Sequence, residues 1–276
     1  MYKRTDMADE CITPEDESRG SVRRDKRGKI FDITEITIYD DSLFESMGKR
    51  KGRYITLECG NLGDFSDDEN EMINELAYEL GSMIPQGDIL VCGLGNRDIT
   101  PDAIGPLTAS KILATRHLRD ELGEQDNFLK SLRRVSVFAG GVLGQTGIET
   151  AEIISALCRQ IKPSAVIAAD ALACSDINRL GRSVQITDTG ISPGSGVENS
   201  RKEISSYSLG IPVIAIGVPT VVDLRNIAEN ADNSNDMVVT PRNIDRLAER
   251  SAQLMAYAMN KAFHPMLSTE EIRSLF

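Results

Sequence analysis

The stretch ILVCGLGNRDITPDAIGP, residues 89–106, decides how the rest of the chain is interpreted. A short apolar run leads directly into Gly93 and Gly95, and a proline-marked turn then carries the lone carboxylate Asp102. An apolar run, a glycine loop and a following helix are the order in which α/β proteins place polar groups at the carboxyl end of a buried strand. The stretch therefore predicts a functional site at one edge of a sheet.

A second stretch, VIAADALACSD at residues 166–176, repeats this plan and carries Asp170 after its own apolar run. The ordinary interpretation of each residue alone is structural: Asp102 caps a helix, and Asp170 ends a strand. The two carboxylates stand at equivalent strand ends, so a second interpretation has about the same weight as the first. In this second interpretation both carboxylates meet at one site.

Further apolar runs at residues 135–139 and 212–218 alternate with helical patterns along the chain. This alternation predicts an α/β fold with a mainly parallel sheet and helices on both faces, plus a small N-terminal β-containing extension. The expected helices include residues 40–47, 106–122 and 220–230.

The expected domain organisation is a mobile arm followed by one domain. Residues 1–28 are dense in charge and show almost no apolar periodicity, so we expect a mobile N-terminal arm. Residues 29–276 then form a single α/β domain, within which residues 29–63 make a small subdomain.

Composition excludes several classes of function. A net charge of −11 argues against general nucleic-acid binding, which needs a basic face. No apolar run approaches the ~20 residues that cross a bilayer, and the polar, acidic start of the chain does not resemble a secretory signal. The five scattered cysteines contain no CxxC pair, which favours reduced thiols in the cytoplasm.

The scarcity of histidine narrows the chemistry further. The glycine loop has neither the G-x-G-x-x-G spacing nor the lysine of a P-loop, and two nearby carboxylates would repel a phosphate. Only His117 and His264 could serve a nucleophilic triad, neither beside a GxSxG elbow, and no HExxH motif is present.

Paired carboxylates remain as the candidate catalytic groups. One carboxylate can activate water while the other holds a proton for the leaving amine. Pro101 and Pro106 favour an irregular turn at Asp102, which would aim its carboxylate into the crevice.

At these residues the sequence resembles the germination proteases of spore-forming bacteria and, more distantly, the hydrogenase-maturation peptidases. The matching blocks follow one another along nearly the whole chain: RTDMADE (4–10), GLGNRDITPDAIGPL (93–107), TRHL (115–118), GQTGIET (144–150), AADALA (168–173), ITDTGISPGSGVENSRKEIS (186–205), GIPVIAIGVPTVVD (210–223) and MVVTPRNID (237–245).

The resemblance implies an aspartic-type endopeptidase whose two catalytic aspartates fall on Asp102 and Asp170. It also implies a zymogen that clips its own N-terminus at a site similar to its substrates, here between Asp6 and Met7 in TDMADE. Beside these residues, we expect substrate contacts from the glycine loop and a positive group near it: Gly93, Gly95, Asn96 and Arg97. Arg116, Arg201 and Lys202 are further candidates for positive charge.

The implied substrates are the small acid-soluble spore proteins, cut in the cytoplasm of the spore core during germination. The resemblance further implies a homo-oligomer, a tetramer in this family, and neither a cofactor nor a metal is expected. Two alternatives stay open: a maturation-type peptidase in which the aspartates ligate a hard cation, and a non-catalytic relative that keeps the fold. One departure from the family is the short link between Asp223 and Thr240, where family members carry a longer stretch.

Overall fold

The structure, a computed structural model, describes most of the chain. The described residues are 5–12, 21–41, 44, 48–64, 66–123, 126–194, 201–227 and 237–276.

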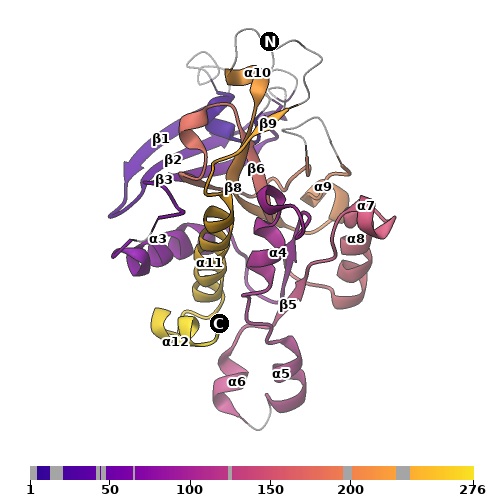
Figure 1. The fold of residues 1–276 in the computed structure, drawn as a ribbon. Coiled ribbons are helices and arrows are strands. Elements are labelled where there is room, and N and C mark those ends of the chain that lie inside the picture. The colour runs from indigo at the N-terminus through magenta and orange to yellow at the C-terminus, as the bar shows by residue number, and fades with distance from the viewer. Residues whose placement is uncertain are drawn as a thin grey trace.

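The described residues form one sheet of nine strands, in the order β1-β2-β3-β7-β8-β6-β4-β5, with β9 paired to β8 (Figure 1). The strands are β1 (Ser21–Arg27), β2 (Asp32–Ile38), β3 (Gly52–Glu58), β4 (Ile89–Gly93), β5 (Val135–Phe138), β6 (Ala165–Cys174), β7 (Ser183–Thr187), β8 (Val213–Asp223) and β9 (Val238–Val239).

The half of the sheet that carries the two aspartates is parallel. Strands β5, β4, β6 and β8 pair in parallel, and the predicted apolar runs form these strands. Nearly all residues of β4, β6 and β8 are buried, as expected for a parallel sheet covered by helices, whereas β5 at the edge is only partly buried. The predicted α/β class is therefore confirmed.

Strands β7, β3, β2 and β1 continue the sheet by antiparallel pairing. They include the predicted N-terminal β-containing extension. Because β3 pairs directly with β7, the strands within residues 29–63, expected as a small subdomain, continue the main sheet.

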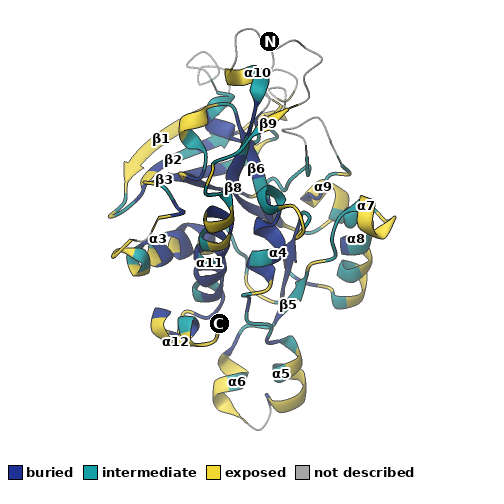
Figure 2. Cartoon of the chain, viewed as in Figure 1, coloured by how far each residue is buried: buried dark blue, intermediate teal, exposed yellow. Residues whose placement is uncertain are grey.

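Helices cover both faces of the sheet (Figure 2). On one face α3, α4 and α11 pack over the large core, and on the other α8 packs over β4, β6 and β8 through a smaller apolar cluster. The helices are α3 (Glu69–Gly81), α4 (Ile104–Ala109), α5 (Arg116–Leu122), α6 (Asn127–Ser131), α7 (Leu143–Thr146), α8 (Thr150–Ile161), α9 (Ser206–Leu209), α10 (Leu224–Ile227), α11 (Ile244–Phe263) and α12 (Thr269–Ser274). None of the helices in the described residues is long and apolar enough to cross a membrane.

Two predicted helices differ in the structure, and a third cannot be compared. The helix predicted at residues 106–122 is two helices, α4 and α5. Of the helix predicted at residues 220–230, residues 220–223 belong to β8, because Val221 and Val222 pair with β6, and residues 224–227 form α10. Residues 228–230 lie outside the described residues. The helix predicted at residues 40–47 lies largely outside the described residues.

The predicted mobile arm is also different. Ser21–Arg27 forms β1, which pairs along its whole length with β2. Residues 5–12, here called the N-terminal segment, lie against the sheet, and Met7 and Ala8 are fully buried. Apolar contacts hold these two residues in place. The prediction of a mobile arm rested on charge density, which does not reveal such contacts. Residues 1–4 and 13–20 lie outside the described residues.

Candidate active site

The glycine loop after β4 brings Asp102 close to the end of the strand. Gly95 has a φ of +103°, which favours glycine, and a side chain there would collide with the backbone oxygen of Asp102. Gly93 packs against Gly105 at the start of α4, where a Cβ on either residue would meet backbone. The glycines therefore serve close packing between β4 and α4, and they fix the turn that carries Asp102.

Asp102 ends a 3-10 turn, Thr100–Asp102, as the two flanking prolines predict. Its side chain is half-buried, and Oδ2 accepts a hydrogen bond of 2.7 Å from the backbone N–H of Asn96. A hydrogen bond from an N–H group favours the ionised carboxylate. The loop thus orients Asp102 and supports its negative form.

Asp170 lies on β6 and is only 4% exposed. Its Oδ1 accepts a hydrogen bond of 2.9 Å from the N–H of Ala171. Asp102 and Asp170 both line a cavity of about 400 Å³, here called the aspartate cavity. The structure therefore brings the two predicted carboxylates together, although Asp170 does not end its strand as predicted, because β6 continues past it to Cys174 and pairs with β8 there.

The two aspartates differ in how strongly their surroundings raise their pKa values. Burial raises the pKa of Asp170 well above its ordinary value, and the charges of Asp102 and Asp6 raise this pKa further. Burial also raises the pKa of Asp102, while the hydrogen bond from Asn96 lowers it. Of the two, Asp170 is therefore the better candidate to keep a proton as pH rises, and Asp102 is the better candidate for the anion.

The other predicted site residues are divided between the cavity and its surroundings. Gly95 and Asn96 line the aspartate cavity, as do Arg201 and Lys202, and Lys202 forms an ion pair with Glu152.

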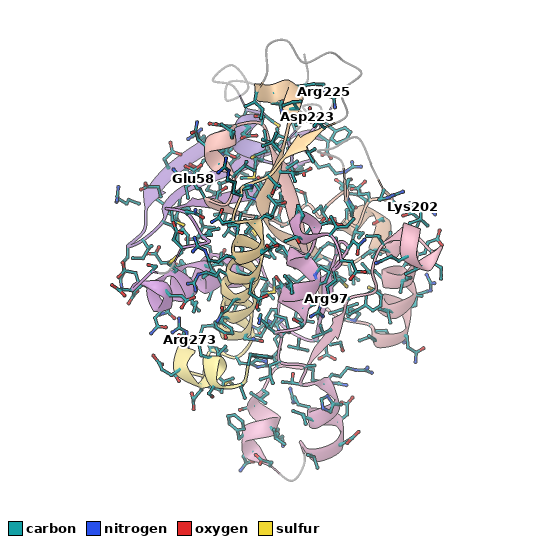
Figure 3. The ribbon with its side chains drawn as sticks, viewed as in Figure 1. Glu58, Arg97, Lys202, Asp223, Arg225 and Arg273 are labelled. Atoms are coloured by element: carbon teal, nitrogen blue, oxygen red, sulfur yellow. The ribbon has the colours of Figure 1, made fainter. Side chains whose placement is uncertain are left out.

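Gly93 and Arg97 lie outside it. Gly93 is buried in packing. Arg97, labelled in Figure 3, is exposed. It lines a neighbouring hollow together with Gln145. Arg116 lies on α5, where it pairs with Asp120 and does not line the cavity.

The N-terminal segment enters the same cavity. Asp6 lines it together with the two aspartates, and its backbone is hydrogen-bonded to the end of β6. The N–H of Asp6 donates to the carbonyl of Ala173 at 2.8 Å, and the N–H of Ala173 donates to Asp6 Oδ2 at 2.9 Å. Part of the chain therefore already lies beside Asp102 and Asp170, and it turns into a short 3-10 helix at Ala8–Glu10.

The next two residues of the segment fill apolar sites. The side chain of Met7 packs among buried residues of β6 and β8, Leu172, Cys174 and Val222. Ala8 packs against β2 and β3 in a second small cluster of Ile36, Ile38 and Tyr54. The segment covers a face of the sheet on which these side chains would otherwise be exposed.

The carbonyl oxygen of Asp6 accepts two hydrogen bonds. Lys49 Nζ donates at 2.7 Å, and Gln185 Nε2 donates at 2.9 Å. The other end of the Gln185 amide, Oε1, accepts from the N–H of Ala8 at 2.7 Å. One side chain therefore holds the backbone on both sides of Met7.

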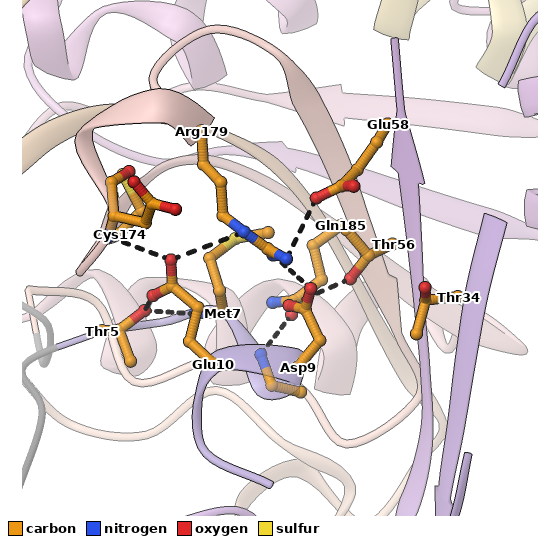
Figure 4. A network of polar contacts seen from close by, with 12 residues as sticks. Thr5, Met7, Asp9, Glu10, Thr34, Thr56, Glu58, Cys174, Arg179 and Gln185 are labelled. Carbon is orange, nitrogen blue, oxygen red and sulfur yellow. Dashed lines mark hydrogen bonds and ion pairs between the residues drawn. The ribbon is translucent and has the colours of Figure 1, made fainter. Parts of the chain in front are cut away.

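The acidic end of the segment is bound by Arg179 (Figure 4). Arg179 forms ion pairs with Asp9, with Glu10 at 3.8 Å and with Glu58 at 3.1 Å. The carboxylate of Glu10 also accepts hydrogen bonds from the backbone N–H groups of residues 175 and 176, at 2.7 and 3.1 Å. The surface that holds the N-terminal segment thus has a specific binding site for Glu10, the acid four residues after Asp6.

Sequence reasoning missed Lys49, Gln185 and Arg179 as site residues. Lys49 belongs to a basic run at residues 49–53, the one available signal, since such a run can form a docking patch. Gln185 and Arg179 carry no local signal, because only the pairing of distant strands brings them to the cleft. Among the residues that the structure describes, no group of three or more His, Cys, Asp or Glu is arranged to hold a metal ion.

The fold and the site together define an α/β protein that holds a segment of its own chain beside two carboxylates, one buried and one half-buried. Comparison with known proteins identifies it further. The profile of a family described as germination protease matches residues 2–234. The germination protease of Caldanaerobacter subterraneus is 38% identical over 317 aligned positions, which cover 99% of this chain and 97% of that protein. The chain belongs to the germination protease family and is a peptidase, a hydrolase, of spore germination.

Other relatives agree with this assignment. The germination protease of Clostridium tetani is 35% identical, covering 99% of both chains, and that of Bacillus subtilis is 40% identical over 81% of this chain and 62% of its own. The 317 positions aligned with the Caldanaerobacter protein exceed the 276 residues of this chain, so that relative contains insertions. Among solved structures, the hydrogenase maturation protease HycI of Thermococcus kodakarensis is similar, with 20% identity, 66% of this chain and 98% of that chain covered, and a TM-score of 0.36.

Proposed function

We propose that this chain is an aspartic-type endopeptidase that begins the degradation of small acid-soluble spore proteins. In this proposal it is made as a zymogen, cuts itself between Asp6 and Met7, and acts in the cytoplasmic core of the spore as a homo-oligomer. The observation that carries the proposal is the position of the N-terminal segment, because Asp6 lines the cavity of Asp102 and Asp170.

The contacts of the segment support its role as a stand-in for substrate. TDMADE offers an acid before the cut, an apolar residue after it, then a small residue and two acids. Each of these has a matching contact: Ala173 N–H for Asp6, an apolar site for Met7, a small cluster for Ala8 and Arg179 for the acids. A spore protein with the same pattern would bind by the same contacts.

The chemistry follows from the protonation states of the pair. Asp102 takes a proton from a water molecule while the water oxygen bonds to the carbonyl carbon of Asp6. Asp170 then gives its proton to the nitrogen of Met7 as the C–N bond breaks. The products are a carboxylic acid at Asp6 and a free amine at Met7, and proton exchange with solvent restores the pair.

The test is self-cleavage of the full chain. We expect purified protein to yield a new N-terminus at Met7, found by N-terminal sequencing and intact mass. Asp102→Asn and Asp170→Asn should each slow this reaction by about 100-fold to 10,000-fold, because each removes one side of proton transfer. The same preparations should cut an added small acid-soluble spore protein at a matching site.

Three outcomes would contradict the proposal. Full activity in either asparagine variant would remove the pair from the mechanism. Loss of activity on chelation, restored by a divalent cation, would favour the metal-dependent alternative. Absence of any cut in the chain or in the added spore protein, over the range of mildly acidic pH, would favour a non-catalytic relative.

A further inference from the structure

The carbonyl group of the proposed scissile bond is already held by two donors, a cation and an amide. Lys49 Nζ and Gln185 Nε2 lie 2.7 and 2.9 Å from the carbonyl oxygen of Asp6. When water attacks a peptide carbonyl, negative charge develops on this oxygen, and donors already directed at it stabilise the transition state more than the ground state.

We propose that Lys49 and Gln185 form the oxyanion-binding site of this peptidase. The inference rests on the proposed function, since it takes the Asp6–Met7 bond as the bond that is cut. It adds two catalytic residues to the aspartate pair and gives them one role: neither transfers a proton, and both stabilise the oxyanion.

Gln185 is suited to this role because its position is fixed. It lies in the middle of the sheet on β7, pairs with β3 and β8, and is 5% exposed. The N–H of Ala8 fixes the orientation of its amide, since Oε1 must accept that bond and Nε2 then faces the carbonyl of Asp6. Both hydrogen bonds of the Gln185 amide go to peptide backbone, so Gln185 can bind a substrate of any sequence in the same way.

Lys49 is held by its neighbour in the chain. The guanidinium of Arg50 makes two hydrogen bonds to the carboxylate of Glu203, at 2.9 and 2.8 Å. It also lies over the rings of Phe44 and Tyr207, 4.8 and 4.9 Å from their centroids. These contacts fix the backbone next to Lys49, so its flexible side chain reaches the carbonyl from an anchored base. Preorganised donors of this kind need little rearrangement during the reaction.

The oxyanion donors and the aspartates reach Asp6 from two different cavities. Lys49 and Gln185 line a cavity of about 260 Å³, and Asp102 and Asp170 line the aspartate cavity. Asp6 lines both. Water can therefore be activated on one side of the peptide while the oxygen stays bound on the other.

In the resulting step, the carbonyl π electrons move to the oxygen of Asp6 as the water oxygen bonds to carbon. The ammonium of Lys49 and the amide N–H of Gln185 hold that charge while Asp102 takes the proton from water. Collapse of the intermediate re-forms the C=O bond and expels the nitrogen of Met7, which Asp170 protonates. No other reactant is required.

The experiment measures self-cleavage of the full chain as a first-order rate. Amide hydrogen exchange at residues 6–11 gives the docked fraction of the N-terminal segment, so the rate can be expressed per docked segment. We expect Lys49→Met and Gln185→Leu each to lower that rate by about 100-fold to 1,000-fold, the effect of losing one oxyanion donor. Lys49→Arg keeps a cationic donor and should recover part of the loss, and Lys51→Met is the matched control for charge and should cleave normally.

Wild-type rates per docked segment in both Lys49→Met and Gln185→Leu would overturn the inference. So would a loss explained entirely by undocking, since it would leave these residues only a binding role. Asp102→Asn and Asp170→Asn, run alongside, separate the two proposals: if they are inactive while the Lys49 and Gln185 variants are normal, only this inference fails. If the aspartate variants are active, or the wild-type cut falls elsewhere, the proposed function fails and this inference fails with it.

Discussion

Asp170 of β6 and Gln185 of β7 lie on either side of Gly217, which belongs to β8, the strand between them. All three residues face the same side of the sheet. Gly217 of β8 pairs in parallel with Asp170 and antiparallel with Gln185. From the spacing of strands, the backbones of the two residues are roughly 10 Å apart. Because Gly217 has no side chain, it can line the smaller cavity between Asp170 and Gln185, with Leu172 packed close to it.

We expect Gly217→Ala to impair both cleavage and folding. A Cβ at this position would lie 2.7 Å from both the backbone oxygen of Asp170 and the side chain of Leu172. Shifting them should cost about 1–3 kcal/mol of stability and lower the self-cleavage rate by about 10-fold to 100-fold. Urea unfolding and cleavage rates would measure both. Gly144→Ala, where a Cβ meets nothing within 4 Å, is the control; equal cleavage in both variants would contradict the expectation.

Self-cleavage should slow as pH rises above the ordinary range of carboxyl groups. Burial and the charge of Asp102 raise the pKa of Asp170, so the folded protein keeps a proton that the unfolded chain has lost. Raising pH through that pKa removes the proton needed by the leaving amine, and it also lowers stability. Cleavage rates from pH 4 to pH 8 should therefore show a falling limb at their upper end.

The same linkage predicts that Asp170→Asn is more stable than wild type at pH 7, because a neutral amide avoids the cost of burying a charge. Urea unfolding at pH 5 and pH 7 would measure this, and the gain should be larger at pH 7. A gain that is equal at both values would show that ionisation of Asp170 is not its cause.

Substitution of Met7 should show an apolar requirement after the cut. Met7 is fully buried among Leu172, Cys174 and Val222. Met7→Leu conserves volume and should cleave within about tenfold of wild type. Met7→Lys would bury an unpaired charge and should slow cleavage by about 100-fold or more. Comparable rates for the two variants, followed by mass spectrometry, would argue against this apolar site.

Arg179 should govern docking of the segment rather than the chemical step. Its guanidinium binds Asp9 and Glu10 but contacts neither aspartate of the pair. Arg179→Gln should reduce the docked fraction by about 10-fold to 100-fold, as expected for charge-assisted hydrogen bonds, with the rate per docked segment unchanged. Arg182→Gln, a change at a nearby exposed arginine, should leave both quantities as in wild type.

His264 should make the protein sensitive to acid independently of the active site. It is fully buried, its Nδ1 accepts a hydrogen bond from the N–H of Arg133, and burial lowers its pKa to about 4. Stability from the neutral imidazole is complete above pH 6.5 and is lost as pH falls toward 4, about 3 kcal/mol in all. Urea unfolding between pH 7 and pH 4 should show this loss in wild type and a smaller one in His264→Gln.

Local sequence patterns predicted the parallel half of the sheet and the turn at Asp102. Pro101 and Pro106 restrict the backbone around this residue, and the structure has a 3-10 turn and a new helix there. Such effects act over a few residues, so the sequence displays them directly.

The cleft as a whole depends on long-range pairing. Gln185 reaches the carbonyl of Asp6 because β7 pairs with β3 and β8, and Arg179 faces the segment through a loop that follows β6. Neither arrangement leaves a local pattern. The buried state of Met7 was missed for a similar reason: a single apolar residue in a charged stretch acquires its partners only in the folded chain.

The uneven distribution of contacts along the N-terminal segment has a consequence for activation. Met7, Ala8 and Glu10 make many of the segment's contacts. All three stay covalently attached to the enzyme after the proposed cut between Asp6 and Met7. The new terminus is then a tethered product, held at an effective concentration in the millimolar range. Under the proposed function, cutting and activation are therefore separate events, and the first spore protein must displace a product that the enzyme still carries.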